Sequence, residues 1–351
     1  MVEDESSRTP FGAASAETQA FNKDLLRRLT LLPDQWAYPP AVVRERRAQG
    51  LGPFPLAPRS PDAREIAVPG PHGEVRLRIL APKTRPSTGA YLHLHGGGWT
   101  LGAADEQDPR LAEIAEATGL TAISCEYRLA PEHPYPQGPD DCEAAAAWLL
   151  GEGESLFGGN RFAIGGESAG ANLAAAVLLR LRGRTDLPAR FGAAVFTCGC
   201  FDLRLTPSAR NWGADKLVLN TRDLKMFVRH YLSHGHDAAD PDISPLLADL
   251  HGLVPAHFVV GSADPLLDDT LFMHARWVAA GNAAEIAVHP GGCHVFQHFD
   301  LEIARTSNRA IDAFLNRILA AACPPSLSGP HPIIQPPRRR PCPPSRHCCL
   351  S

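Results

Sequence analysis

Short apolar runs alternate with longer alanine- and leucine-rich stretches between residues 64 and 319. The short runs are rich in β-branched side chains, as in buried strands, while the longer ones repeat apolar positions at helical spacing. This alternation predicts an α/β domain with a mainly parallel sheet flanked by helices. We expect strands at 65–70, 74–80, 90–94, 121–127, 161–165, 192–198, 256–261 and 284–289, and helices at 109–118, 140–150, 168–181, 267–280 and 300–319.

Two stretches do not fit the alternation: residues 1–60, with a helix expected near 20–32, and residues 203–245. Long insertions at the carboxyl edge of such a sheet usually serve as lids, so we assign both to a helical cap. The catalytic domain is then expected at 61–322. The remaining segment, 323–351, holds nine of the 33 prolines and no acidic residue, which predicts a disordered tail. A docking peptide and an unselected extension remain equally open interpretations of it.

The motif Gly166-Glu167-Ser168-Ala169-Gly170 lies between an expected strand and an alanine-rich helix. A serine in this context forms a nucleophile elbow, a sharp turn that needs small neighbours so that the hydroxyl stands clear. By itself the motif has a second interpretation, a glycine-rich turn with an incidental serine. The motifs described next favour the catalytic interpretation.

Residues 95–99 (HGGGW) directly follow an expected strand. Three consecutive glycines leave backbone N–H groups accessible, which is what an oxyanion hole requires. We expect the amides of Gly96, Gly97 and Ala169 to supply its donors. A phosphate-binding loop is the alternative, but the segment lacks a Lys-Ser/Thr ending and the GxGxxG spacing.

A serine nucleophile needs a base, and the base needs a carboxylate that orients it. Asp264 and His294 each follow an expected strand, downstream of Ser168 and in that chain order. Both therefore belong to the sheet edge at which α/β proteins build their sites. Asp268 is the alternative for the carboxylate, although it is better placed to begin the next helix. His298 is the alternative for the base.

Together these motifs resemble the hormone-sensitive-lipase family of α/β-hydrolases, also described as bacterial family IV carboxylesterases. The resemblance covers about residues 60–320 and rests on HGGGW (95–99), YRLAPEHPYP (127–136), GESAGANLAAA (166–176) and DPLLDD (264–269). It implies the α/β-hydrolase fold with a helical cap, no cofactor, and hydrolysis of esters with short to medium acyl chains. Glu167 places the chain with members that carry an acidic residue before the serine. The residues that match the family pattern are Ser168, Asp264 and His294 for the triad and Gly96, Gly97 and Ala169 for the oxyanion hole.

The chain departs from this family around the expected base. Val295 stands where relatives more often have a glycine, which suggests that His294 is restricted or repositioned. Cys293 is the other departure, and we hypothesise that alkylating its thiol slows turnover. The alternative is a buried, inert cysteine, because reactivity needs thiolate character and exposure.

The segment 127–136 also has two interpretations: it shapes the alcohol side of the pocket, or it supports the HGGG turn. We favour the second, with Arg128 and Glu132 fixing the loop backbone. Trp99 is expected to pack behind the oxyanion turn rather than to contact substrate.

Composition then excludes several classes of function. The chain has 351 residues, of which 44% are hydrophobic and 21% charged, and its formal net charge is −4. This favours a folded enzyme and offers no basic field for nucleic acid. The first twenty residues lack the apolar core of a secretory signal, and the longest apolar stretch, 191–201, is too short to span a bilayer.

The nine cysteines are an odd and dispersed set, which indicates free thiols in a reducing cytoplasm. The pairs His93/His95 and His234/His236 lack a third ligand at a recognisable spacing, so no metal is predicted.

These observations predict a cytoplasmic serine carboxylesterase without cofactor or metal. Its expected partner is a small-molecule ester, with a homodimer as one allowed assembly. We expect activity to rise with pH through the pKa of His294, which lies near the ordinary value of about 6.5 unless its surroundings move it. Two alternatives remain: an amidase or hydrolase of one larger ester, and a ligand-binding protein on the same scaffold, as in the plant gibberellin receptors. An interfacial lipase is a third, although no long exposed apolar lid can be identified in residues 1–60 or 203–245.

Overall fold

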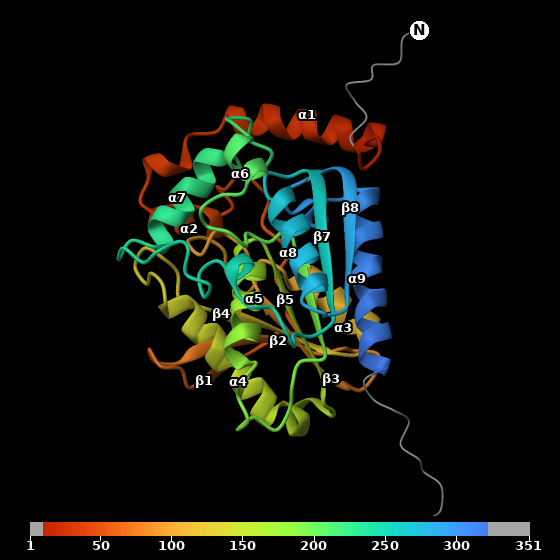
Figure 1. Cartoon of the computed structure of the whole chain (residues 1–351). Helices are drawn as coiled ribbons and strands as arrows, with labels where there is room; N and C mark the ends of the chain where they lie inside the picture. Colours follow the sequence, from red (N-terminus) through yellow and green to blue (C-terminus); the bar gives the residue numbers. More distant parts are fainter. Residues whose placement is uncertain (1–9, 322–351) are drawn as a thin grey trace, which may run out of the picture.

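A computed structural model of the chain describes residues 10–321, so the predicted tail lies outside the described residues. Its centre is one eight-stranded sheet in the order β1-β2-β4-β3-β5-β6-β7-β8 (Figure 1). The strands are β1 (Arg64–Val68), β2 (Val75–Leu80), β3 (Gly89–Leu94), β4 (Thr121–Glu126), β5 (Arg161–Glu167), β6 (Ala193–Thr197), β7 (Ala256–Ala263) and β8 (Ala284–Cys293). All eight expected strands are present, and β8 runs four residues further than expected.

The sheet is parallel from β4 to β8, whereas β1 and β2 form an antiparallel hairpin. Two registers position the site. Leu94 of β3 pairs with Gly166 of β5, so the segments that leave these strands emerge side by side. Ala263 of β7 pairs with Cys293 of β8, which places the residues that follow them next to each other.

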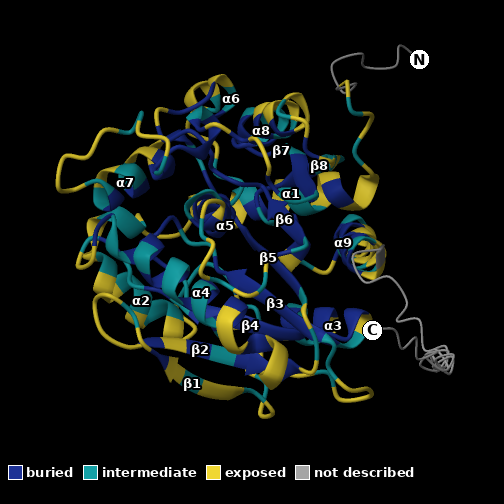
Figure 2. Ribbon diagram, turned by 60° about the horizontal axis from the view of Figure 1, so that its bottom comes forward, coloured by how far each residue is buried: buried dark blue, intermediate teal, exposed yellow. Residues whose placement is uncertain are grey.

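Helices cover both faces of the sheet and enclose two apolar cores. One core packs α4, α5 and α8 against the sheet, and the other packs α3 and α9 (Figures 1 and 2). Nearly all residues of α5 are buried, which explains its many alanines: small side chains let this helix lie close to the strands. The bounds are α3 (Asp108–Thr118), α4 (Gln137–Phe157), α5 (Ala169–Leu181), α8 (Leu267–Ala279) and α9 (Glu302–Ala321).

Two further segments, residues 16–59 and 203–245, lie beyond the carboxyl ends of the strands, and we call them the cap segments. Their helical elements are α1 (Ala16–Thr30), η2 (Gln35–Ala37), α2 (Pro40–Ala48), α6 (Pro207–Asn211) and α7 (Thr221–Tyr231). The two segments meet where the ring of Trp36 packs edge-on against Phe227, with 4.9 Å between centroids. The helix expected near 20–32 is α1, which begins earlier in the chain because Ser15 caps its first turn and ends at Thr30.

Within residues 10–321, none of the helices combines the length and the apolar character that crossing a bilayer requires.

Candidate active site

Ser168 lies at the sharp turn between β5 and α5, with φ 56° and ψ −120°. The turn closes against the end of β3. A Cβ atom on Gly166 would lie 2.2 Å from the carbonyl oxygen of Leu94, and one on Gly170 would lie 1.8 Å from it. Only glycine fits at either position, which is the reason for the small residues on both sides of the serine. The strand-turn-helix context predicted from the sequence is therefore confirmed.

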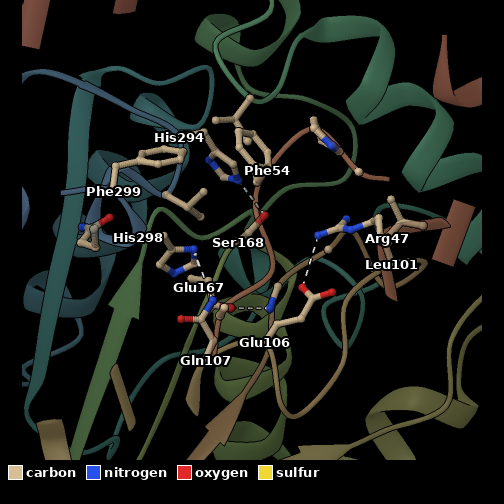
Figure 3. A pocket seen from close by; sticks show the side chains of 18 of the residues that line it. Arg47, Phe54, Leu101, Glu106, Gln107, Glu167, Ser168, His294, His298 and Phe299 are labelled. Atoms are coloured by element: carbon tan, nitrogen blue, oxygen red, sulfur yellow. Dashed lines mark hydrogen bonds and ion pairs between the residues drawn. The ribbon is translucent and has the colours of Figure 1, made fainter. Parts of the chain in front are cut away.

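His294 brings both of its ring nitrogens into the expected contacts. Its Nε2 lies 3.0 Å from Ser168 Oγ (Figure 3). Its Nδ1 lies 2.9 Å from Asp264 Oδ2. An ionised carboxylate only accepts hydrogen bonds, so Nδ1 carries the proton and Nε2 is free to accept that of the serine. All three side chains are buried, with exposed fractions of 9% for Ser168, 4% for His294 and 1% for Asp264.

The electrostatics of this group favour a basic histidine. Burial by itself lowers the pKa of His294, but the charge and the hydrogen bond of Asp264 outweigh it and hold the pKa well above its usual value. Asp264 is itself fixed by the Leu266 N–H, which donates to Oδ1 at 2.8 Å. The pKa, expected near the ordinary histidine value unless the surroundings of His294 move it, is thus moved upward by the buried carboxylate.

Neither of the two alternatives, Asp268 and His298, forms a hydrogen bond with Ser168 in the described part of the chain. Asp268 lies in the first turn of α8, where its Oδ2 accepts from the Ser208 N–H at 2.8 Å. His298 lines the same cavity, but its Nδ1 lies 3.3 Å from Gln107 Nε2 (Figure 3).

The expected oxyanion donors need one correction. The Gly96 N–H donates to Glu167 Oε1 at 2.6 Å, so it is not available to a substrate oxygen. Ala169 is the first residue of α5, and its amide has no partner within the helix. In the described part of the chain, the amides of Gly97 and Gly98 have no acceptor either. The geometry thus favours Gly97, Gly98 and Ala169. Gly98 could not be preferred over Gly96 from the motif alone, because the contact between Glu167 and Gly96 depends on the folded structure.

Glu167 connects the nucleophile turn to the HGGG turn. Its second oxygen, Oε2, lies 2.8 Å from His93 Nε2, and His93 Nδ1 lies 3.2 Å from Ser124 Oγ. Burial raises the pKa of Glu167, but the charge and the hydrogen bond of His93 lower it by more, so that the pKa is about 2. Glu167 is therefore an ionised carboxylate whose two oxygens hold Gly96 and His93 directly beneath the serine. Sequence analysis assigned no role to either side chain, although an acidic residue inside the serine motif was a signal.

The loop at 127–136 supports the HGGG turn, as favoured from the sequence. Tyr127 Oη donates to the His95 carbonyl at 2.7 Å, and the ring of His95 stacks on that of Tyr127 at 4.2 Å. The Arg128 N–H donates to the buried Asp141 carboxylate at 3.0 Å, which fixes the loop backbone. The support therefore comes mainly from Tyr127, which the sequence did not single out.

Glu132 has a different role from the expected one, because it forms an ion pair of 2.7 Å with Arg44 of α2 and so ties the loop to the cap. Trp99 is buried and stacks on Tyr231 of α7, with 4.6 Å between centroids. Its expected packing role behind the oxyanion turn is confirmed.

The departures around the base do not displace it. Val295 adopts the left-handed region, φ 50° and ψ 34°, where a β-branched residue is strained, yet His294 reaches both of its partners. The expected repositioning is therefore wrong. Cys293 is 1% exposed, and burial raises the pKa of its thiol. These conditions disfavour thiolate chemistry and support the inert alternative over the alkylation hypothesis.

One group of metal-ligating side chains meets in the described part of the chain. The ligand atoms of Cys198, Asp264 and His294 lie within 4.8 Å of one another. Asp264 and His294 already bond each other, and burial raises the pKa of the Cys198 thiol, which keeps it protonated. The donors present therefore fit a hydrogen-bonded catalytic group rather than a metal site.

A cavity of about 1350 Å³ opens above Ser168 and His294 (Figure 3). This volume exceeds the roughly 300–1,000 Å³ typical of small-molecule sites, and most of its apolar lining comes from the cap segments. Phe227 of α7 packs directly on the HGGG turn, since a Cβ on Gly98 would lie 2.2 Å from its ring. The apolar residues lining the cavity include Leu29, Leu32, Leu51, Phe54, Leu56, Val218, Leu219, Phe227 and Phe299.

A serine at the sharp turn after a central strand of a mostly parallel sheet, with an aspartate directly after β7 and a histidine directly after β8, is the arrangement of the α/β-hydrolase class. The family model for the alpha/beta hydrolase fold matches residues 91–298. The chain is 34% identical to the carboxylesterase NlhH of Mycobacterium tuberculosis over 259 residues, which cover 71% of this chain and 80% of that one. It is also 34% identical over 231 residues to the carboxylic ester hydrolase LipN of the same organism, covering 64% of this chain and 61% of LipN.

A solved esterase described as belonging to the bacterial hormone-sensitive lipase family superposes with a TM-score of 0.72 at 29% identity, covering 88% of this chain and 99% of that one. The chain belongs to the hormone-sensitive-lipase family of α/β-hydrolases, and it is a carboxylic ester hydrolase.

Proposed function

We propose that the protein is a cytoplasmic serine carboxylesterase for esters with short to medium acyl chains, and that Ser168, His294 and Asp264 are its catalytic triad. The observation that carries this proposal is the continuous hydrogen-bonded group from Ser168 Oγ through His294 to Asp264, at 3.0 and 2.9 Å. Free amides at Gly97, Gly98 and Ala169 complete the arrangement that acyl transfer needs.

In the first half-reaction, Ser168 Oγ attacks the ester carbonyl carbon while His294 Nε2 accepts the hydroxyl proton. The carbonyl electron pair moves onto its oxygen, which accepts hydrogen bonds from the backbone amides. When the tetrahedral intermediate collapses, the bond to the alcohol oxygen breaks and His294 donates its proton to that oxygen. The alcohol leaves, and the acyl group stays on Ser168.

In the second half-reaction, water takes the place of the alcohol. His294 accepts a proton from the water as its oxygen attacks the acyl carbon, and the same amides bind the oxyanion. The bond to Ser168 Oγ then breaks, and His294 returns the proton to the serine. The net reaction converts one ester and one water into an acid and an alcohol.

The cellular setting is part of the same proposal. The five cysteines of residues 10–321 are all free and buried, which suits a reducing compartment such as the cytoplasm. The net charge of −4 gives no reason to expect nucleic acid as a partner. A monomer and a homodimer both suit this chemistry, and light scattering after size exclusion distinguishes them.

The test is hydrolysis of p-nitrophenyl esters from acetate to palmitate by the wild type and by Ser168→Ala. Ser155→Ala, on the outer part of α4, is the matched control. We expect turnover that peaks at short or medium chains and is lost only in Ser168→Ala. Turnover of p-nitroanilides with none of esters would favour the amidase, and binding of an ester analogue without any turnover would favour the binding protein.

A further inference from the structure

Exposed apolar side chains gather in one short stretch of the N-terminal cap segment. Of the nine large hydrophobic residues that are exposed in the described chain, six lie between positions 31 and 56. Single exposed apolar residues are normal on a protein surface, whereas such a concentration marks an interaction site. We call this group the apolar rim, and its members are Leu31, Leu32, Tyr38, Val42, Leu51 and Leu56.

The apolar rim is continuous with the candidate active site. Four of its members, Leu32, Tyr38, Leu51 and Leu56, also line the cavity that contains Ser168. In Figure 2 the strands are mostly buried, whereas the cap helices α2 and α7 carry exposed and intermediate positions. A substrate that enters the cavity therefore passes an apolar surface that faces solvent.

The rim lies in a stretch of the chain that has a surplus of cations. Residues 21–60 contain seven Lys or Arg and three Asp or Glu, a surplus of four positive charges in a chain whose net charge is −4. Five of these seven cations form ion pairs. Arg46, however, lies 5.4 Å over the ring of Tyr38 and lines the cavity, and among residues 10–321 it has no ion-pair partner. An apolar face flanked by cations is the chemistry that binds an anionic lipid surface.

We propose that the apolar rim docks the enzyme on anionic lipid surfaces and takes ester substrate from them directly into the cavity. This inference rests on the proposed esterase function and names the physical state of its substrate. A second copy of the chain is the other conceivable occupant, but a folded partner seated on the rim would cover the entrance that the ester must use. A lipid surface, in contrast, supplies esters at that entrance.

Binding is measured on the full chain carrying Ser168→Ala, so that no vesicle component is hydrolysed. Sedimentation with sucrose-loaded vesicles compares phosphatidylcholine alone with a mixture that contains phosphatidylglycerol. The rim variant is Leu31→Ser with Val42→Ser, because these two residues do not line the cavity. The matched control is Leu156→Ser with Phe272→Ser, which removes exposed apolar side chains elsewhere.

We expect the parent chain and the control to bind the anionic vesicles at least fivefold more than the neutral ones, and the rim variant to lose at least fivefold of that binding. Absent binding, equal binding to neutral vesicles, or unchanged binding of the rim variant would overturn the proposal. So would a dimer in light scattering that the rim substitutions dissociate.

Activity provides the second measurement, in a background with Ser168 intact. Tributyrin hydrolysis is followed across its solubility limit in the presence of anionic vesicles, beside hydrolysis of soluble p-nitrophenyl acetate. We expect the rate of tributyrin hydrolysis by the wild type to rise at least threefold above the solubility limit. The rim variant should lose this rise in rate, while its rate on p-nitrophenyl acetate stays unchanged. If the wild type hydrolyses no ester, the proposed function fails while vesicle binding still tests the rim.

Discussion

The residues around Ser168 and the cap segments differ in how far they are buried and in what holds them in position. Ser168, Asp264 and His294 are all less than one-tenth exposed and leave the ends of paired strands, so the sheet register sets their separations. The cap segments keep much of their surface exposed and join each other through a few side chains. The sheet thus sets the positions of these three side chains, whereas the cap segments line the cavity that leads to them.

One carboxylate connects several groups in each region. Glu167 does so near Ser168, and Asp223 does so in the cap segments. Glu167 is enclosed beneath the serine and holds Gly96 and His93. Asp223 of α7 joins the cap segments, since it accepts from Trp36 Nε1 at 2.6 Å and pairs with Lys216 at 3.1 Å. Loss of the first carboxylate should disturb catalysis, and loss of contacts to the second should disturb the cap.

The largest effect is expected for Ser168→Ala. Removing the nucleophile should lower kcat/KM for p-nitrophenyl butyrate by about 10⁴–10⁶-fold, because the remaining groups only bind and polarise the ester. The thermal midpoint should stay close to that of the wild type. A residual rate within a hundredfold of the wild type would show that another residue is the nucleophile.

Asp264→Asn should lower kcat by about 10⁴-fold, because the amide no longer selects the correct tautomer of His294 or stabilises its cation. It should also move the pH profile. Asp264 raises the pKa of His294, and only the neutral base is active, so wild-type activity is lost as the pH falls through a value above the ordinary one. In the variant this acid limb should shift to lower pH; an unmoved limb in kcat/KM would contradict the assigned pair.

Glu167→Ala should lower kcat by about 10²-fold with little change in KM, because the HGGG turn loses its anchor and its amides are misplaced. Glu167→Gln keeps an acceptor for the Gly96 N–H and should recover most of that rate. Affinity for a boronic acid transition-state analogue should follow kcat through the series. If Gln and Ala behave alike in both measurements, the carboxyl group does not position the oxyanion turn.

The smallest effect on turnover is expected for Trp36→Phe, which keeps the ring against Phe227 and removes the donor to Asp223. A hydrogen bond to a charged group is worth about 1.5–3 kcal/mol, and urea unfolding should show a loss at the low end of this range. Turnover of p-nitrophenyl acetate should stay within about twofold, as expected for a contact distant from the reacting atoms. A fall as large as that of Glu167→Ala would show that the cap also sets the catalytic geometry.

Sequence analysis identified the strands and most of the residues that the structure brings together around Ser168, because these depend on local requirements of the backbone. The glycines on both sides of Ser168 are required because an added Cβ atom would lie 1.8–2.2 Å from the Leu94 carbonyl oxygen. This requirement can be recognised from the motif alone. Asp264 and His294 could be chosen because chain order and strand ends restrict the candidates. Gly96 was assigned wrongly, since its N–H is taken by Glu167, and that contact depends on where a side chain points across two strands.

By itself, the sequence determined the alternation of strands and helices, the nucleophile turn, and the order of the groups that follow it, because backbone sterics and periodicity act over a few residues. Only the tertiary structure decided which amides stay free, how the buried Asp264 shifts the pKa of His294, and which apolar residues of the cap face solvent at the cavity mouth. These properties arise from contacts between segments distant in the chain, and burial sets their strength.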